Sequence, residues 1–449
     1  MNKRIKFFIL VCIIISIITM ILFTGLSTVG KKYLVGSKYD SRANRSIEIV
    51  KRGSIFDRNN ILINHSELID GKYLRQYNFP ELYSHLIGYV DKKYGSTGIE
   101  NAYNSILQGY GQISSWTEIK NKIYKEKCGE NLILSVDHKL QSECKSLMRN
   151  LKGAIVITDP RNGEVLSYYS NPGFDETKIN EALGSNDSAM LDRVKNGKYS
   201  PGSVFKIISS LNILNNTNDL EFDDQGFVKI LDGTISNYGK IKYGRVDLHA
   251  AITNSLNTFF AVKGLPLTDK LVQLTNDIDN KIKESTDNNY AINIRKGDNN
   301  FKNAILQIGQ GEVTASPLAI NLITQAIYNE GYYYSPKYVK SILTNDFKFS
   351  RDIKSEKIDL NINKEHAKYI KDAMFDVVKI GTASGYGLGD DCGGKTGTAE
   401  LSGKKYNYWF TGFISGEKPK IITIVVENVN EMGYNKTVEI FRNLVKQNL

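Results

Sequence analysis

The chain has 449 residues, of which 41% are hydrophobic and 24% are charged. This composition excludes an intrinsically disordered chain, and the length allows two or three domains that each bury a core of their own. The formal net charge is +10, but the lysines and arginines are scattered along the chain. A solvated basic surface that faces acidic surroundings is therefore favoured over a surface that binds nucleic acid.

The cysteines and histidines argue against a disulfide framework and against a metal site. Four cysteines are too few for such a framework, and none of them forms a C-x-x-C pair. The five histidines are far apart and form no H-x-x-x-H pattern. We therefore expect no metal site and no cofactor.

An apolar run near the N-terminus predicts a membrane anchor. The run Phe7–Leu26 contains no charged residue, and it follows the basic residues Lys3, Arg4 and Lys6. At about 1.5 Å rise per residue, such a helix spans roughly 30 Å, the hydrocarbon thickness of a bilayer. Its length favours an uncleaved anchor over a signal peptide, and the basic side is expected to face the cytoplasm. We therefore expect residues 1–30 to form a cytoplasmic tail and a single-pass anchor in the cell membrane, with the rest of the chain outside the cytoplasm.

The texture of the sequence changes near residue 131. Residues 31–130 mix short β-like runs with glycine and polar turns. After that point LILSV predicts a strand, and Asp137 is placed to cap a following helix. GAIVITD and EVLSYYS predict a hairpin, YWFTGFIS and KIITIVVENV two further strands, and NKTVEIFRNLVKQ an amphipathic C-terminal helix. These connections predict an α/β fold of the α+β type, with an antiparallel sheet flanked by helices, and not a doubly wound parallel sheet.

The most informative local feature is the segment YSPGSVFKIISSLNIL. Pro201 and Gly202 interrupt the chain before an apolar helical pattern, which places Ser203 in the first turn and Lys206 one turn further on the same face. Serine is a poor nucleophile without an adjacent base, and an amine with apolar neighbours favours its neutral form. The pair therefore suits nucleophilic catalysis, although S-x-x-K alone is a weak signal because the chain repeats this spacing at Ser142/Lys145, Ser402/Lys405 and Ser415/Lys418.

Two further motifs strengthen this interpretation. Ser255-Leu256-Asn257 follows a predicted helix, 52 positions (255 − 203) after Ser203. The segment GGKTGTAE occurs once and places four residues on a predicted strand: Lys395, Thr396, Gly397 and Thr398. Glycine in a strand permits close approach of an extended peptide, and a lysine with two hydroxyls suits a carboxylate. The order S-x-x-K, S-x-N, K-T-G in an exported chain indicates one shared active site.

This set of motifs is found in penicillin-binding proteins and class A β-lactamases, and the chain resembles the penicillin-binding transpeptidase superfamily. IGQGEVTASPLA is similar to the superfamily's GQG-x-x-x-(S/T)-P-L segment, and RGSIFDRNNIL resembles the Arg-Gly-x-Ile-x-Asp-Arg motif of class B penicillin-binding proteins. In that motif Asn60 stands where the family usually has glycine. The resemblance implies that residues 31–130 form an elongated, β-rich pedestal or dimerisation-type domain, and that residues 131–449 form the transpeptidase domain.

The resemblance also implies a reaction and its participants. The protein would be a serine D,D-transpeptidase that forms peptide cross-links in peptidoglycan through an acyl-enzyme, and β-lactams would inhibit it. Its partners would be stem peptides, the cytoplasmic membrane and a membrane glycan polymerase, with no nucleic acid. The catalytic residues would be Ser203 as nucleophile, Lys206 as proton acceptor, Ser255 as proton relay, Asn257 as orienting amide and Lys395 as a source of positive field. Thr396, Gly397 and Thr398 would bind the substrate, and the oxyanion hole would use the backbone N–H groups of Ser203 and Thr398.

Other functions remain open at this stage. A D,D-carboxypeptidase or a β-lactamase of the same fold would use the same acylating residues, although no E-x-x-L-N segment follows Asn257 at a suitable distance. A β-lactam-binding scaffold or sensor is the non-enzymatic alternative, but only about six residues precede the anchor to form a signalling part. Cys392, just before Lys395, is expected to be a small buried apolar residue and not a redox-active thiol.

Overall fold

The computed structural model describes residues 4, 7, 11, 13–20, 22, 50–109, 128–185, 187–286, 291–430 and 436–446. The predicted anchor, Phe7–Leu26, falls largely outside these residues. Residues 13–20 within it are helical, and their apolar side chains are exposed. In the part of the chain that the structure describes, no helix is both long enough and apolar enough to cross a bilayer.

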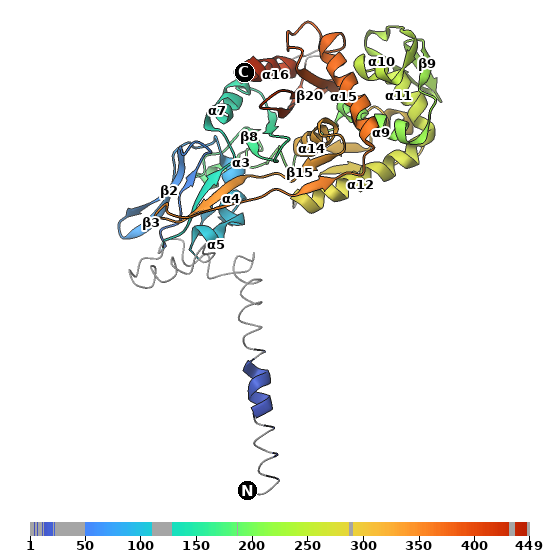
Figure 1. Cartoon of the computed structure of the whole chain (residues 1–449). Coiled ribbons are helices and arrows are strands. Elements are labelled where there is room, and N and C mark those ends of the chain that lie inside the picture. Colours follow the sequence, from blue (N-terminus) through green and yellow to red (C-terminus); the bar gives the residue numbers. More distant parts are fainter. Residues whose placement is uncertain are drawn as a thin grey trace.

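A five-stranded sheet forms the centre of the larger half of the molecule (Figure 1). Its order is β19-β20-β21-β7-β8, and every neighbouring pair is antiparallel. The strands are β7 (Gly153–Thr158), β8 (Val165–Asn171), β19 (Cys392–Leu401), β20 (Lys405–Ile414) and β21 (Lys420–Val429). The predicted hairpin and the two predicted C-terminal strands are confirmed, and β19, which carries the K-T-G motif, lies at an edge of the sheet.

Helices cover both faces of this sheet. Successive side chains of a strand point to opposite faces, and in β20 the ring of Phe410 packs on Phe441 whereas the hydroxyl of Thr411 bonds to Thr324. Phe441 belongs to α16 (Lys436–Lys446) and Thr324 to α14 (Pro317–Tyr328). Two more helices flank the sheet: α7 (His138–Leu147) beside β8, and α15 (Lys364–Lys379) beside β19. The α+β class with a flanked antiparallel sheet is therefore confirmed.

A second sheet of six strands, order β17-β16-β6-β1-β2-β3, lies below the first in Figure 1. It joins strands that are far apart in the chain: β1 (Ile55–Phe56), β2 (Leu62–Ile69), β3 (Lys72–Tyr77), β6 (Asn131–Leu134), β16 (Val339–Leu343) and β17 (Ser350–Asp352). Parallel pairing of β1 with β6 and antiparallel pairing of β6 with β16 connect the N-terminal region to a segment from the C-terminal half. Small elements pack beside this sheet: α3 (Ser84–Ile87), β4 (Val90–Asp91), β5 (Gly95–Ser96), α4 (Gly98–Ala102) and α5 (Asn104–Leu107).

The N-terminal motif around Arg52 has a structural role in this region. Glu100 is fully buried and accepts hydrogen bonds from Arg52 (2.7 Å) and Arg75 (2.6 Å), both of which are nearly inaccessible to solvent. Burial alone would raise the pKa of Glu100, but the two guanidinium groups outweigh it and hold this pKa below its usual value. Asn60 adopts φ +66°, the left-handed conformation that asparagine tolerates better than most residues, so the replacement of glycine preserves the turn.

A mainly helical lobe completes the molecule, at the upper right of Figure 1. Its helices are η1 (Gly202–Phe205), α9 (Lys206–Asn216), α10 (Leu248–Thr253), α11 (Asn257–Gly264), η3 (Leu265–Leu267), α12 (Thr268–Thr286) and α13 (Asn300–Leu306). Short strand pairs accompany them: β9 (Glu221–Asp224) with β12 (Gly244–Asp247), β10 (Phe227–Ile230) with β11 (Gly233–Ser236), and β13 (Ile292–Ile294) with β14 (Val313–Ala315). The remaining elements are α8 (Ile179–Gly184), η2 (Tyr238–Lys240), β15 (Tyr332–Tyr334) and β18 (Lys357–Asp359). Helix α9 is buried along its first eight residues, so it forms the core of the lobe.

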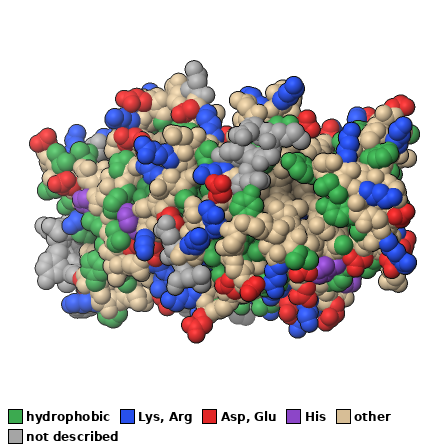
Figure 2. All heavy atoms as spheres, turned by 90° about the horizontal axis from the view of Figure 1, so that it is seen from above, with side chains coloured by type: hydrophobic (Ala, Val, Ile, Leu, Met, Phe, Trp, Pro, Cys, Tyr) green, Lys and Arg blue, Asp and Glu red, His purple; other side chains and the backbone are tan. Residues whose placement is uncertain are grey.

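Basic and acidic side chains are interspersed over the face of the molecule in Figure 2. This mixture agrees with a solvated surface, as expected from the scattered charges in the sequence.

Candidate active site

Ser203 lies where the helical lobe meets the edge of the five-stranded sheet. It is half-buried in the short helix η1, directly before α9. The preceding Gly202 has φ +53°, and a β-carbon there would lie 2.3 Å from the carbonyl oxygen of Thr398 on β19. Gly202 also donates its N–H to the carbonyl of Gly309 over 2.9 Å. A glycine is therefore required before Ser203, because any side chain would push β19 away.

Lys206 follows one turn later, and its ammonium group is completely buried. Its Nζ donates to the carbonyl of Ser255 (2.7 Å), to Ser255 Oγ (3.3 Å) and to Asn257 Oδ1 (2.7 Å). Burial lowers the pKa of Lys206 well below its ordinary value, and the nearby charge of Lys395 lowers it further. The structure thus brings the S-x-x-K and S-x-N segments into direct contact and favours a neutral amine one helical turn after Ser203.

The S-x-N segment is the tight turn between α10 and α11. Ser255 has φ +56°, a conformation that few non-glycine residues adopt. Asn257 donates its Nδ2 to the carbonyl of Ser236 over 2.8 Å while its Oδ1 accepts from Lys206. Because both ends of the amide are bonded, the orientation of Asn257 is fixed. The strained backbone conformation of Ser255 thus occurs at the residue whose hydroxyl contacts the Lys206 amine.

Lys395 lies on β19, opposite Thr411 of β20 in the register of the sheet. It is completely buried, and burial lowers its pKa to about 7. Two buried lysines, Lys206 and Lys395, thus lie close enough that the charge of one affects the titration of the other. Such strongly perturbed groups cluster at functional sites more often than elsewhere.

The K-T-G strand presents two hydroxyl groups toward solvent. Thr398 is exposed and Thr396 is half-buried. Lys395, before them, and Gly397, between them, are buried. A β-carbon on Gly397 would lie 2.9 Å from Val204 Cγ1 and 3.1 Å from the carbonyl oxygen of Pro201. Glycine is needed here because β19 lies against the segment around Ser203, and not only because a peptide must approach.

The site includes residues that the sequence motifs did not indicate. Ser236 accepts from Asn257 through its backbone carbonyl, and Thr382 Oγ1 lies 2.7 Å from Thr396 Oγ1. Ser236 ends β11, and Thr382 lies in the turn after α15, so neither residue belongs to a motif. A backbone carbonyl carries no sequence signal, but GTAS (Gly381–Ser384), a run of small residues directly after the segment that forms α15, was a signal that could have marked Thr382.

Cys392, at the start of β19, is buried with its Sγ 3.7 Å from Asp391 Oδ1. Burial raises the pKa of this thiol to about 12, so it stays protonated. A buried, protonated thiol agrees with the expected role as a small apolar residue.

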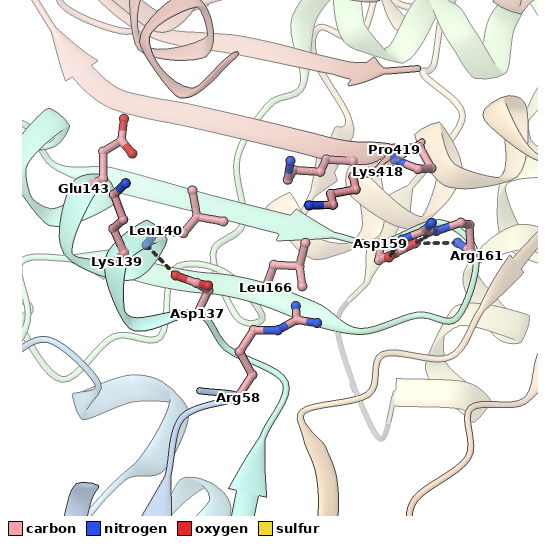
Figure 3. A pocket seen from close by; sticks show the side chains of 11 residues that line it. Arg58, Asp137, Lys139, Leu140, Glu143, Asp159, Arg161, Leu166, Lys418 and Pro419 are labelled. Carbon is pink, nitrogen blue, oxygen red and sulfur yellow. Dashed lines mark hydrogen bonds and ion pairs between the residues drawn. The ribbon is translucent and has the colours of Figure 1, made fainter. Parts of the chain in front are cut away.

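A separate cavity of about 510 Å³ lies between the N-terminal region and the five-stranded sheet (Figure 3). Its charged residues include Arg58, Asp137, Asp159 and Arg161, and Arg161 forms a two-pronged ion pair with Asp159. No lining residue belongs to the three motifs. This cavity is therefore separate from the Ser203 site.

The fold and the order of the three motifs are those of the penicillin-binding class of proteins. Comparison with known families gives the same answer: a model described as the penicillin binding protein transpeptidase domain matches residues 153–446. The chain belongs to this family. A second model, the penicillin binding protein A dimerisation domain, matches residues 52–132, as in class B members.

Individual relatives agree. The peptidoglycan D,D-transpeptidase MrdA of Acinetobacter baumannii is 27% identical over 434 residues, covering 81% of this chain and 65% of that protein. PbpA of Mycolicibacterium smegmatis, also named a peptidoglycan D,D-transpeptidase, is 24% identical over 82% of each chain. The chain thus spans slightly less than two thirds of the length of MrdA.

Solved structures show the same fold. Penicillin-binding protein A of M. tuberculosis, solved as its ceftriaxone acyl-enzyme, superposes with a TM-score of 0.80 at 22% identity, over 88% of this chain and 98% of that one. The D,D-transpeptidase domain of a peptidoglycan glycosyltransferase from Eggerthella lenta gives 0.75 at 26% identity, over 89% and 98%.

Proposed function

We propose that this protein is a serine D,D-transpeptidase that cross-links peptidoglycan stem peptides through an acyl-enzyme on Ser203. The observation that carries the proposal is Lys206, a buried amine with a lowered pKa, one turn from a half-buried serine and hydrogen-bonded to Ser255 and Asn257. Serine needs such a neutral base to become nucleophilic. The names of the relatives from A. baumannii and M. smegmatis support the same activity.

In the first step Ser203 Oγ forms an ester bond to the carbonyl carbon of the penultimate D-alanine. Lys206 accepts the hydroxyl proton, the amide bond to the terminal D-alanine breaks, and Ser255 relays a proton to the leaving amine. Negative charge that develops on the carbonyl oxygen is stabilised by the backbone N–H groups of Ser203 and Thr398. Asn257 keeps Lys206 in position throughout this step.

In the second step an amine from another stem peptide attacks the ester. The new amide is the cross-link, and Ser203 regains its proton. The terminal carboxylate of the donor is bound before the first step by Thr396 and Thr398, with Gly397 between them, while Lys395 supplies positive field. A β-lactam would enter by the same acylation and remain as a long-lived ester, because its ring-opened product stays attached and blocks the attacking amine.

The proposed location is the outer face of the cytoplasmic membrane, with residues 1–30 as cytoplasmic tail and anchor, residues 31–130 as pedestal and residues 131–449 as the transpeptidase domain. The exposed apolar side chains of residues 13–18 support an anchor. A membrane-embedded glycan polymerase is the proposed partner, because a cross-linking enzyme of this type needs freshly made strands. Protease treatment of intact cells, followed by detection of the C-terminal region, tests the orientation.

Labelling with a fluorescent penicillin tests the proposed reaction. We expect a stable adduct on the wild type and none on Ser203→Ala. Ser402→Ala is the matched control, because Ser402 has the same S-x-x-K spacing but lies on an exposed turn. An adduct that persists on Ser203→Ala would overturn the proposal. Incubation with a stem peptide and an acceptor amine then separates the outcomes, since a transpeptidase forms the cross-linked product and a carboxypeptidase only releases D-alanine.

A further inference from the structure

Thr382 lies beside the K-T-G strand although it belongs to none of the three motifs. Its Oγ1 is 2.7 Å from Thr396 Oγ1, and the contact is at the solvent-exposed side of β19. Thr382 is in the turn after α15, 14 positions before Thr396. A hydroxyl in this place can orient the Thr396 hydroxyl and so affect a ligand that Thr396 binds.

The turn that holds Thr382 is fixed by contacts with α10 and with α15 itself. Thr382 donates its N–H to the carbonyl of Thr253 over 3.3 Å, and Ala383 donates to the carbonyl of Val377 over 2.9 Å. A β-carbon on Gly381 would lie 2.3 Å from the Thr253 carbonyl oxygen, so the turn lies directly on the end of α10. Thr382 thus contacts both the end of α10, two positions before Ser255, and the K-T-G strand.

We propose that Thr382 is a positioning residue of the carboxylate-binding site: its hydroxyl bonds to that of Thr396 and thereby orients one O–H toward the carboxylate of the bound donor peptide. This inference rests on the function proposed above. Each hydroxyl has one proton and two lone pairs. The bond between Thr382 and Thr396 uses one of the two protons, whichever residue donates, and leaves the other for the substrate. A hydrogen bond from that O–H to a carboxylate is charge-assisted and stronger than a neutral one.

Loss of the Thr382 hydroxyl leaves Thr396 without the partner that fixes its rotation. A single hydrogen bond of this kind contributes about 0.5–1.5 kcal/mol, which corresponds to a roughly three- to tenfold change in rate. The effect should fall on ligands that carry the carboxylate. A ligand in which the carboxylate is esterified has no charge for the oriented O–H to bind, so its acylation rate should change little.

The test compares benzylpenicillin with its methyl ester on each variant. For the wild type and three variants, Thr382→Val, Thr382→Ser and Thr177→Val, the acylation rate constants for the acid and the ester are measured by competition with a fluorescent penicillin. We expect Thr382→Val to lower the acid-to-ester rate ratio about three- to tenfold. Thr382→Ser, which keeps a hydroxyl, should have a ratio close to that of the wild type. Thr177, whose exposed hydroxyl bonds to Asp175 outside the site, controls for loss of any threonine hydroxyl, and its variant should keep the wild-type ratio.

The ratio is internal to each preparation, so partial misfolding of a variant cancels. A ratio in Thr382→Val equal to that of the wild type would overturn the inference, as would equal slowing of acid and ester, which indicates a merely structural role. Failure of the proposed function is separate, because it would show as labelling that survives in Ser203→Ala.

Discussion

Lys206 Nζ and Asn257 Oδ1 are 2.7 Å apart although 51 positions separate them in the chain. The same amide donates its Nδ2 to the carbonyl of Ser236 over 2.8 Å. Lys206 therefore has its position set by a side chain that is itself held at both ends. This rigid chain of contacts fixes the amine through neutral groups, and no carboxylate bonds to it among the residues that the structure describes.

Removal of the Asn257 amide should slow acylation without unfolding the protein. In Asn257→Ala, Lys206 loses one of its hydrogen bonds and its fixed position, and a hydrogen bond between neutral groups contributes about 0.5–1.5 kcal/mol. We expect the acylation rate constant with a fluorescent penicillin to fall roughly two- to tenfold. Asn215→Ala, at the exposed end of the same helix α9, is the control and should react at the wild-type rate. Equal rates in Asn257→Ala and the control would contradict the positioning role.

The rate of acylation should depend on pH through both buried lysines. Lys206 accepts a proton only when neutral, so the rate should rise with pH as the amine passes its lowered pKa. In the proposed mechanism Lys395 supplies positive field only when protonated, so the rate should fall as pH increases beyond about 7. A pH profile of acylation in wild type and Lys395→Met checks this, because the variant should lose the falling limb. If the pH profile of Lys395→Met keeps a falling limb with the wild-type midpoint pH, the decrease in rate arises from another titrating group.

Lys395 should also limit the stability of the folded protein. Burial lowers its pKa from 10.5 to about 7, so below pH 7 the folded protein holds an unfavourable buried charge. Between pH 7 and 10.5 the folded state is neutral while the unfolded state still binds the proton, so this cost decreases as pH rises. We expect Lys395→Met to raise the free energy of unfolding by on the order of a few kcal/mol below pH 7, and to raise the melting temperature most in that range. The advantage should shrink toward pH 10.

Thermal unfolding at several pH values measures this difference. Lys405→Met, on an exposed residue of β20, is the control and should shift the melting temperature little at any pH. A destabilised Lys395→Met protein at pH 6 would show that the buried ammonium has a compensating partner.

The buried ion pairs of Glu100 with Arg52 and Arg75 should contribute more to the free energy of unfolding than an exposed ion pair. Glu100→Gln leaves two arginines without their carboxylate in a nearly dry environment, and breaking a buried pair in this way costs about 3–5 kcal/mol. Glu221→Gln, which breaks the exposed pair with Arg245, should cost less than about 1 kcal/mol. Urea unfolding of both variants gives the comparison, and similar midpoints would refute it.

The sign of the acid dependence follows from the lowered pKa of Glu100. Its contribution is present above the ordinary pKa of a carboxyl group and is lost as pH falls through the lowered value in the folded state. The stability of Glu100→Gln should therefore decline less on acidification than that of the wild type.

A side chain on Gly202 should separate Ser203 from β19. In Gly202→Ala the new β-carbon would lie 2.3 Å from the Thr398 carbonyl oxygen, and the residue would have to keep φ +53°. The oxyanion hole proposed between Ser203 and Thr398 would widen, so penicillin labelling should fall at least tenfold, as for loss of one oxyanion donor. Gly184→Ala, where no atom lies within 4 Å of the new β-carbon, should label normally. Normal labelling of Gly202→Ala would show that β19 can move without loss of function.

Local sequence signals predicted the elements that depend on nearby residues. Asp137 caps α7 by accepting the N–H of Leu140, and Pro160 to Gly163 close the β7–β8 hairpin, as expected from the residue types. The residues of the three motifs could be selected because their order and spacing are distinctive. Their assigned roles stay predictions that the substitutions above address.

Contacts made by backbone atoms or by unmarked threonines could not be predicted. Ser236 contributes only a carbonyl oxygen, which every residue has, and the position of Thr382 depends on how α15 packs on α10. The pairing of β16 with β6 is similarly hidden, since about 200 positions separate the strands and neither carries a pairing signal.

The parallel pairing of β1 with β6 makes the boundary near residue 130 a poor place to divide the molecule. A fragment that begins at residue 131 would keep β6, β16 and β17 but lose β1, the parallel neighbour of β6. The uncovered edge of β6 would offer its free N–H and C=O groups to other chains, a recognised route to aggregation. A shortened protein for crystallisation or inhibitor screening should therefore keep everything from Val50 onward, so that both Arg52 and β1 are retained.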